Sequence, residues 1–298
     1  MTGAKVNADS RSDSADAAGA CVLVTGASGF IGSALVRELA SLFRIRSAVQ
    51  RLGPDTDWRA ALEGVDAVVH LAGPAHARVA PEEALERAIV DGTRVLAEEA
   101  ARAGVRRFVF LSSIHASARR THDVALSEAM TPQPDDAYGR AKLAAESAVL
   151  VHAAMNPVVL RPPLVHDAQA KGNFARLLRL LDSATPLPLA GTRNKRSVIS
   201  LSSLNAAIAA VLRGAGTGVF HVVDQPAVST SEIAALLREG MGRPARLFRL
   251  PGFSAFAPRA LIESLEIDGA RFRETFAWTG VDTREALIAC GRDWAARR

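Results

Sequence analysis

The only tyrosine of the chain stands one helical turn before one of its four lysines. On a helix, Tyr138 and Lys142 would share a face, so both side chains could reach one point in space. The ammonium would favour the phenolate and lower the phenol pKa from about 10 towards working pH. A phenol adjusted in this way can exchange a proton with a substrate hydroxyl or ketone. An exposed tyrosine beside an incidental lysine is the alternative interpretation.

Three glycines with the spacing G-x-x-G-x-x-G form a second candidate site. Gly26, Gly29 and Gly32 follow the apolar run 21–25 and open the amphipathic segment 30–42. The first would allow a tight turn, the second would let backbone approach a pyrophosphate, and the third would let the helix pack closely. Phosphates would then face free N–H groups at the helix N-terminus. A glycine turn with a purely structural role is the alternative.

Short apolar runs alternate with helical patterns through the first half of the chain, which predicts an α/β fold with a parallel sheet and helices on both faces. Asp136 is a candidate N-cap for the helix that carries the tyrosine. The predicted strands are 21–25, 45–49, 65–71, 107–111 and 157–160, and the predicted helices are 30–42, 81–102 and 138–151.

The chain divides into three parts. Residues 1–20 are polar and rich in Ser, Asp and Ala, which predicts a disordered tail, and residues 21–165 form the predicted dinucleotide-binding domain. Residues 166–298 form a smaller, mixed substrate-binding region, with a soft boundary because the last strands of the main sheet should come from it. Its predicted elements are helices 173–181, 204–212, 230–241 and 283–295 and a strand at 219–223.

The composition excludes several classes of protein. The 298 residues are 49% hydrophobic and 22% charged, ordinary values for a globular protein. The net charge of +5 comes from scattered basic residues, and no run of them is typical of nucleic-acid binding. We expect no membrane span and no signal peptide. Cys21 and Cys290 lie far apart, which predicts no metal site and favours a reducing, cytoplasmic location.

Taken together, the motifs resemble the extended short-chain dehydrogenase/reductases, and the resemblance covers roughly residues 21–287. It implies a Rossmann-like, doubly wound sheet with bound NAD(H) or NADP(H), and a triad of Ser113, Tyr138 and Lys142. Tyr138 would be the acid/base, Lys142 would hold the nicotinamide ribose, and Ser113 would hydrogen-bond the reacting oxygen. The motifs are TGASGFIG at 25–32, HLAG at 70–73, FLSS at 110–113, YGRAK at 138–142 and LRPPLV at 160–165.

The same resemblance implies the residues that would contact the cofactor. They are Gly26, Ser28, Gly29, Phe30, Ile31, Gly32, Arg51, Leu71, Ala72, Gly73, Tyr138, Lys142 and Pro162.

The C-terminal half carries KGNFARL at 171–177, PLPL at 186–189, RSV at 196–198 and Trp278. In these it is similar to a nucleotide-sugar subgroup, the relatives of UDP-glucose 4-epimerase and the UDP-4-keto-6-deoxy-N-acetylhexosamine 4-reductases of surface-polysaccharide pathways. By that similarity the substrate is UDP-linked, and Asn173 and Arg196 contact its diphosphate or uridine. Arg193, Lys195 and Arg196 place three cations within four residues, which suits a diphosphate. An exposed basic loop is the alternative.

Four departures from the family pattern carry expectations. Gln50 and Arg51 stand where NAD-preferring members carry an acidic residue, which favours NADP(H) over NAD(H). The segment 33–64 is about a dozen residues short, so the third strand of the order 3-2-1-4-5-6 should be absent. Ile89 replaces an asparagine, which removes any proton relay through that position. His166 replaces a tyrosine, and we expect a surface-loop histidine.

The sequence therefore predicts an NAD(P)-dependent oxidoreductase or epimerase that acts at C4 of a nucleotide sugar, without separating a 4-ketoreductase from a 4-epimerase. Gln50 and Arg51 favour the reductase, because an exchangeable NADP(H) suits it. The alternatives are a reductase of a non-sugar ketone and a catalytically inactive, cofactor-sensing homologue, which the short segment 33–64 would explain. The family often forms homodimers through helices that correspond here to 81–102 and 138–151.

Overall fold

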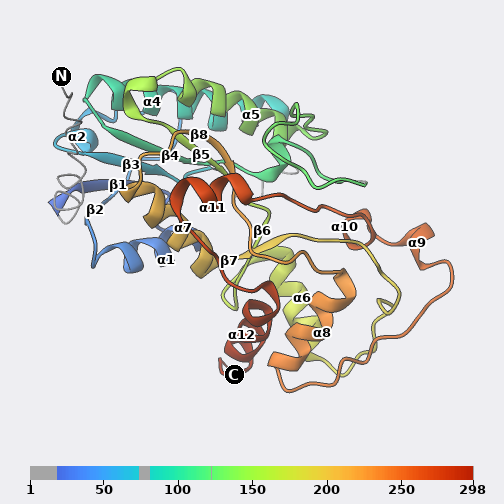
Figure 1. The fold of residues 1–298 in the computed structure, drawn as a ribbon. Helices are drawn as coiled ribbons and strands as arrows, with labels where there is room; N and C mark the ends of the chain where they lie inside the picture. The colour runs from blue at the N-terminus through green and yellow to red at the C-terminus, as the bar shows by residue number, and fades with distance from the viewer. Residues whose placement is uncertain (1–18, 74–80, 122, 298) are drawn as a thin grey trace, which may run out of the picture.

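Six strands form one parallel sheet in the computed structural model, which describes residues 19–73, 81–121 and 123–297. Their order is β2-β1-β3-β4-β5-β8, with helices on both faces (Figure 1), so the predicted α/β, Rossmann-like architecture is confirmed. Residues 1–18 of the predicted tail lie outside the described residues. The strands of this sheet are β1 (Cys21–Thr25), β2 (Arg44–Ser47), β3 (Ala67–His70), β4 (Arg107–Leu111), β5 (Val158–Arg161) and β8 (Gly218–His221).

The side chains of β1 alternate between two cores, one on each face of the sheet. Val22 and Val24 belong to the first core, and Cys21 and Leu23 belong to the second. Parallel strands covered on both faces read as continuous apolar runs, which is why this strand was visible in the sequence. The first core is covered by α1 (Phe30–Leu39), α7 (Leu201–Arg213) and α11 (Ala270–Phe276).

The helices of the opposite face lie above the sheet in Figure 1 and contribute side chains to the second core. The predicted helix 81–102 is interrupted by one π-helical turn, η3, which contains the buried Ile89. The elements of this face are α2 (Arg59–Leu62), α3 (Glu82–Leu85), η3 (Glu86–Asp91), α4 (Gly92–Arg102), α5 (Ala137–Leu150) and the short turns η4 (Ile114–Ala116) and η5 (Ala153–Met155).

The sheet has no third strand beyond β2 in the described residues, as the short segment 33–64 predicted. After β2 the chain forms only α2 before it enters β3. β2 therefore lies at the sheet edge, paired with β1 alone, and its four residues are half-buried or exposed. Losing an edge strand leaves the central strands fully paired, so the core does not depend on it.

The C-terminal region builds a third core on one two-stranded ladder. β6 (Leu164–His166) pairs in parallel with β7 (Val198–Ser200), and β8 then returns to the main sheet. The boundary proposed at residue 165 thus falls inside β6. The helices of this region are α6 (Gly172–Asp182), α8 (Thr230–Gly240), α9 (Phe253–Phe256), α10 (Arg259–Ile262) and α12 (Thr283–Ala295).

The expectation of a surface-loop histidine at position 166 is wrong. His166 is 1% exposed at the end of β6, where its ring centroid lies 6.1 Å from that of Phe174 in α6. Burial lowers the pKa of His166 to about 4, so the ring is neutral. A three-residue strand gives too short a pattern for the sequence to reveal its buried face.

Candidate active site

The glycine turn follows directly from the C-terminal end of β1. Gly26 has a φ of +70°, and a Cβ there would lie 2.8 Å from the backbone nitrogen of Ala72. Only glycine tolerates both the backbone conformation and this approach. The amide of Gly29 donates to the carbonyl oxygen of Gly26 at 2.9 Å and closes the turn, while Gly32 is buried in α1 behind it.

A buried side-chain relay fixes the neighbouring segment 71–73 beside this turn. The Thr25 hydroxyl lies 2.7 Å from Nδ1 of His70 and accepts a bond from the Ala72 amide at 3.2 Å. Nε2 of His70 lies 3.0 Å from the Thr93 hydroxyl, so both ring nitrogens are satisfied. Burial lowers the pKa of His70 to about 3, which keeps the relay neutral. The predicted cofactor contacts Leu71 and Ala72 are thus held against the turn.

The N-terminus of α1 is open to an anion. Gly29 is its N-cap, no side chain caps it, and its first turn holds no acidic residue. Unsatisfied N–H groups and the positive end of the helix dipole favour a negative group there. Ser28 and Gly29 are exposed at this end, and Phe30 and Ile31 are half-buried.

The expected ribose position after β2 holds Gln50 and Arg51. Arg51 is exposed, and the side-chain oxygen of Gln50 is buried with no hydrogen-bond partner among the described residues. A buried acceptor without a donor is costly, so it suits a hydroxyl supplied by a ligand. Together with the turn that excludes a Cβ, this oxygen makes the cradle fit a dinucleotide.

Lys142 of α5 places its ammonium at the C-terminal end of β4. Its ammonium donates to the carbonyl oxygen of Leu111 at 3.0 Å and stands 4.6 Å from the ring centre of Phe110. It is also close to Gly73, since a Cβ placed there would be 3.8 Å from Nζ. Burial lowers the pKa of Lys142 to about 8, against the opposite effect of the Glu146 carboxylate. The lysine therefore stands between β4 and the glycine-containing segment after β3.

Ser113 and Tyr138 meet the same residue, His115. The Ser113 hydroxyl accepts from the His115 amide at 3.2 Å, and the rings of His115 and Tyr138 are edge-to-face at 6.2 Å. Asp136 caps α5 through the amide of Gly139 at 2.6 Å, as predicted, and its other oxygen lies 3.2 Å from Nδ1 of His115. A Cβ at Gly139 would collide with the His115 carbonyl oxygen, so α5 rests directly on η4.

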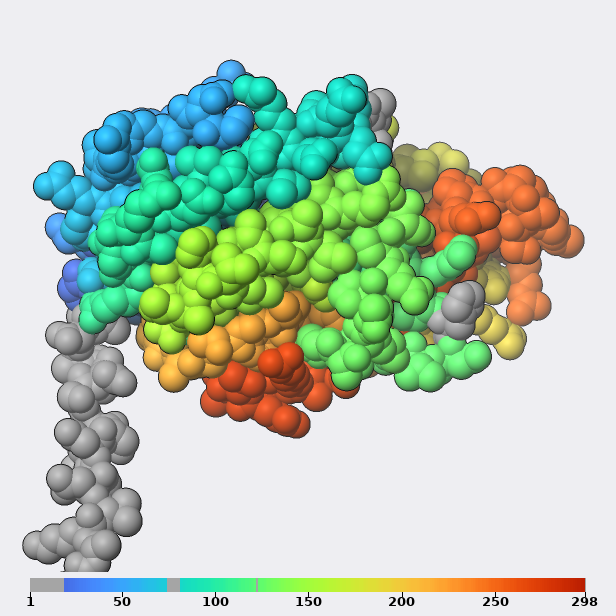
Figure 2. Space-filling view, turned by 90° about the horizontal axis from the view of Figure 1, so that it is seen from above, coloured from blue at the N-terminus to red at the C-terminus, as the bar shows by residue number. Residues whose placement is uncertain are grey.

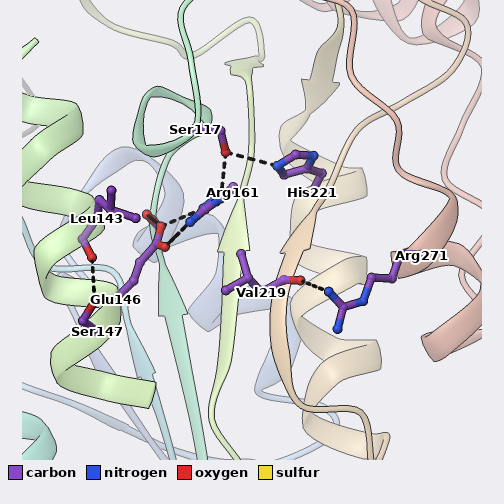
Figure 3. A network of polar contacts seen from close by, with 9 residues as sticks. Ser117, Leu143, Glu146, Ser147, Arg161, Val219, His221 and Arg271 are labelled. Carbon is purple, nitrogen blue, oxygen red and sulfur yellow. Dashed lines mark hydrogen bonds and ion pairs between the residues drawn. The ribbon is translucent and has the colours of Figure 1, made fainter. Parts of the chain in front are cut away.

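A buried ion pair holds η4 at both ends. Arg161 of β5 donates through Nε to the Glu146 carboxylate of α5 at 2.9 Å, and that carboxylate also accepts from the Ser112 hydroxyl. Nη1 of Arg161 donates to the Ser117 hydroxyl at 2.8 Å. Figure 3 shows Ser117 between Arg161 and His221, whose Nε2 lies 3.2 Å from it. Residues 112 and 117 flank the turn that carries Ser113, so the pair positions that turn.

The predicted substrate contacts lie in the C-terminal region. Asn173 is exposed in the first turn of α6, while Arg196 is half-buried just before β7, where its Nη1 donates to the Glu263 carbonyl oxygen at 3.4 Å. Burial lowers the pKa of Arg196. Lys195 is paired with Glu266 at 3.0 Å, and Arg193 is exposed. The three cations thus have different surroundings and do not form one cluster of free charges.

The remaining predicted contact, Pro162, is buried at the end of β5, and its carbonyl oxygen accepts from the amide of Ile114 in η4 at 3.0 Å. Sequence reasoning missed His115 and the Glu146–Arg161 pair. Glu146 carried one signal, because it follows Lys142 by four residues on the same helix face. Nothing local in the sequence marked Arg161 as its partner.

The chain matches the model of the NAD dependent epimerase/dehydratase family over residues 22–215. It is 32% identical to a UDP-glucose 4-epimerase of Vibrio cholerae, over 86% of this chain and 90% of that protein. It is 24% identical to an N-acetyl-alpha-D-glucosaminyl-diphospho-ditrans,octacis-undecaprenol 4-epimerase of Escherichia coli O157:H7, over 77% of this chain and 75% of that protein.

Solved structures share the fold. MoeE5 in complex with UDP-glucuronic acid and NAD is 26% identical, with a TM-score of 0.74 over 93% of this chain and 99% of that chain. RMD from Pseudomonas aeruginosa complexed with NADPH is 23% identical, with a TM-score of 0.77 over 93% of this chain and 100% of that chain.

Replacing one partner of the buried pair should destabilise the protein more than replacing both. Arg161→Met leaves the Glu146 carboxylate buried and unpaired, and should lower the free energy of unfolding in urea by about 3–5 kcal/mol. Glu146→Gln combined with Arg161→Met should recover much of that loss. Arg140→Met is the matched control, because it breaks the exposed pair of α5 with Glu82 and should cost under about 1 kcal/mol. Equal losses in the single and double variants would contradict a buried charge penalty.

The lowered pKa of Lys142 predicts a specific pH dependence of stability. The folded chain disfavours the ammonium, so below about pH 8 folding carries the full cost of burying it. Between about pH 8 and its ordinary value of 10.5, the unfolded chain binds the extra proton, and stability rises with pH. Urea unfolding should show wild type gaining stability over Lys142→Met across that window. Parallel pH profiles for the two proteins would refute the shift.

Proposed function

Because the chain belongs to the NAD dependent epimerase/dehydratase family, we propose that it acts with NAD(P) at C4 of a hexose in a nucleotide sugar, as a 4-epimerase or a 4-ketoreductase. The observation that carries the proposal is Lys142, buried at the C-terminal end of β4 one helical turn from Tyr138 and close to Gly73. When bound, the nicotinamide cofactor supplies the hydride acceptor and donor.

Tyr138 exchanges a proton with the oxygen at C4 in this proposal. The ammonium of Lys142 favours the phenolate form of Tyr138 and so makes the phenol a better base. Ser113 donates its hydroxyl hydrogen to the same oxygen. Its position depends on η4, which the Arg161–Glu146 pair holds through Ser112 and Ser117.

A diphosphate-linked hexose is the substrate class that the two relatives support, since the names of both describe 4-epimerases of such sugars. Asn173 at the start of α6 and the exposed Arg193 would contact the anionic diphosphate. Arg196 is half-buried and bonded to the Glu263 carbonyl oxygen, which fixes one of its nitrogens and leaves its other donors for the substrate.

Two observations favour different members of this pair of reactions. Gln50 and Arg51 stand where a carboxylate would bind the adenosine ribose of NAD, so they favour an exchangeable NADP(H), which suits a reductase. The similarity to two 4-epimerases favours retention of the cofactor. Chromatography of the sugar nucleotides, combined with mass spectrometry and NADPH absorbance, distinguishes the two reactions, because the epimers have equal mass whereas reduction adds two hydrogens. An epimerase interconverts UDP-glucose and UDP-galactose without net cofactor consumption, whereas a reductase consumes one NADPH for each UDP-4-keto-6-deoxy sugar.

Tyr138→Phe should abolish C4 turnover while leaving cofactor binding intact. Removing the proton carrier should lower kcat by about 10²–10⁴-fold. The affinity for NADPH, read by nicotinamide fluorescence, should stay close to wild type. Ser147→Ala on the exposed face of α5 is the matched control and should turn over normally. A Tyr138→Phe variant as fast as its parent would remove Tyr138 from the chemistry, and a wild type that binds neither cofactor would favour the inactive homologue.

Arg51→Ala should weaken NADPH binding and leave NADH binding almost unchanged. An exposed guanidinium beside the adenosine ribose would contact the 2′-phosphate, and a charge-assisted hydrogen bond of about 1.5–3 kcal/mol corresponds to a loss of about ten-fold or more in NADPH affinity. Arg37→Ala, at an exposed position near the end of α1, should change neither affinity. Equal weakening for both cofactors, or none for either, would place the 2′-phosphate elsewhere.

A further inference from the structure

A segment of the C-terminal region, residues 243–262, extends away from the sheet. We call it the arm. It carries the short helices α9 and α10, which lie at the right of Figure 1. The same segment forms the orange end at the right of Figure 2. Neither short helix contains a buried residue.

Large apolar side chains of the arm face outwards. Phe256 is 67% exposed, Phe248 is 43% exposed and Leu250 is 41% exposed. Phe253 is half-buried and packs edge-to-face on Phe256 at 5.6 Å between ring centroids. Exposed apolar area of this kind costs about 25 cal/mol per Å², so it indicates a surface that is covered in use.

One backbone bridge anchors the start of the arm to the body of the protein. The Leu187 amide donates to the Arg246 carbonyl oxygen at 3.0 Å and the Phe248 amide donates to the Leu187 carbonyl oxygen at 3.0 Å, so Leu247 forms a single parallel bridge with Leu187. Arg246, just before the bridge, has a left-handed φ of +43°. Leu247 packs inwards on the third core, whereas Arg246 and Phe248 on either side of it are exposed.

The charge of the arm has a single sign. It contains four arginines and no acidic residue from position 243 to position 262. Arg249 is exposed, and the side chain of Arg259 is 77% exposed beside Glu263 at the end of the arm. Arg243 pairs with Asp182 in the body of the protein. Nη1 of the exposed Arg246 donates to the Ala184 carbonyl oxygen at 2.9 Å, so one nitrogen of this guanidinium is already bonded. Aromatic and aliphatic side chains interleaved with arginines suit the interface of an anionic lipid bilayer.

We infer that the arm contacts the surface of an anionic lipid bilayer. Phe248, Leu250 and Phe256 enter the interface, and the guanidinium groups of Arg246 and Arg249 meet the lipid phosphates. The attachment is peripheral, since no helix in the described ranges is long and apolar enough to cross a membrane.

The base of the arm leads back towards the candidate active site. Ser264 follows the arm and accepts from the Thr121 amide at 2.8 Å, on the chain segment that continues from η4. An open depression of about 420 Å³ lies here, lined by Arg120, Thr121, Asp123, Glu263 and Ser264. A bilayer bound by the arm would therefore lie near the side of the molecule on which the segment after Ser113 emerges.

Sedimentation with lipid vesicles tests this inference independently of any enzymatic activity. The full chain should sediment with vesicles of phosphatidylcholine and phosphatidylglycerol, but not with phosphatidylcholine alone, and added salt should weaken binding. Phe248→Ser with Phe256→Ser should reduce the bound fraction at least ten-fold. Arg246→Gln with Arg249→Gln should weaken binding about five-fold for each arginine.

The matched control is Val151→Ser with Arg102→Gln, which removes a 74% exposed valine and an exposed arginine outside the arm and should bind as wild type. An unchanged melting temperature shows that the arm variants fold. Wild type that stays in the supernatant with anionic vesicles, or arm variants that bind like wild type, would overturn the inference. So would a change of oligomeric state on size-exclusion chromatography without vesicle binding, because it would make the arm an interface between copies of the chain.

Discussion

The buried pair between Glu146 and Arg161 is the interaction on which the site geometry depends. It joins α5 to β5, and through Ser112 and Ser117 it joins both to the turn after β4. Two charges at 2% and 5% side-chain exposure are stable only while each satisfies the other, so the helix cannot slide along the sheet without exposing a cost of several kcal/mol. The same helix carries Tyr138 and Lys142. Glu146, one turn after Lys142, therefore also fixes the position of these two residues relative to the sheet.

The carboxylate of this pair also acts on the charge of Lys142. Lys142 is held by a carbonyl oxygen and an aromatic ring at the end of β4, an environment that disfavours its charge. The Glu146 carboxylate opposes that effect, so the structural carboxylate also supports the ammonium. At neutral pH the ammonium form prevails and its field reaches the neighbouring helical turn. Positioning and electrostatics at this site therefore share a single carboxylate.

The sequence revealed the elements whose pattern is long or regular. The strand 21–25 and the helix 283–295 were predicted with the bounds that the structure has, and the shortness of segment 33–64 foretold the missing edge strand. Prediction from the sequence failed where the residues in contact are distant in the chain. β6 and β7 are three residues each, and β6 ends at the buried His166. No local pattern predicts a ladder of that kind or the partner of Glu146, because both depend on contacts between segments that are distant in the sequence.

In the proposed cofactor site, the missing edge strand would leave recognition of the adenosine end to side chains. With β2 at the edge, the chain beyond it is a loop in which Arg51 is exposed and Gln50 keeps a buried oxygen without a donor. Backbone from a further strand would normally help to shape the adenine side of such a site. Here the contacts available are one amide and one guanidinium, and a guanidinium discriminates mainly by charge. In the proposed cofactor site, selection between the two nicotinamide cofactors would rest on a phosphate contact made at the surface, where ionic strength weakens it.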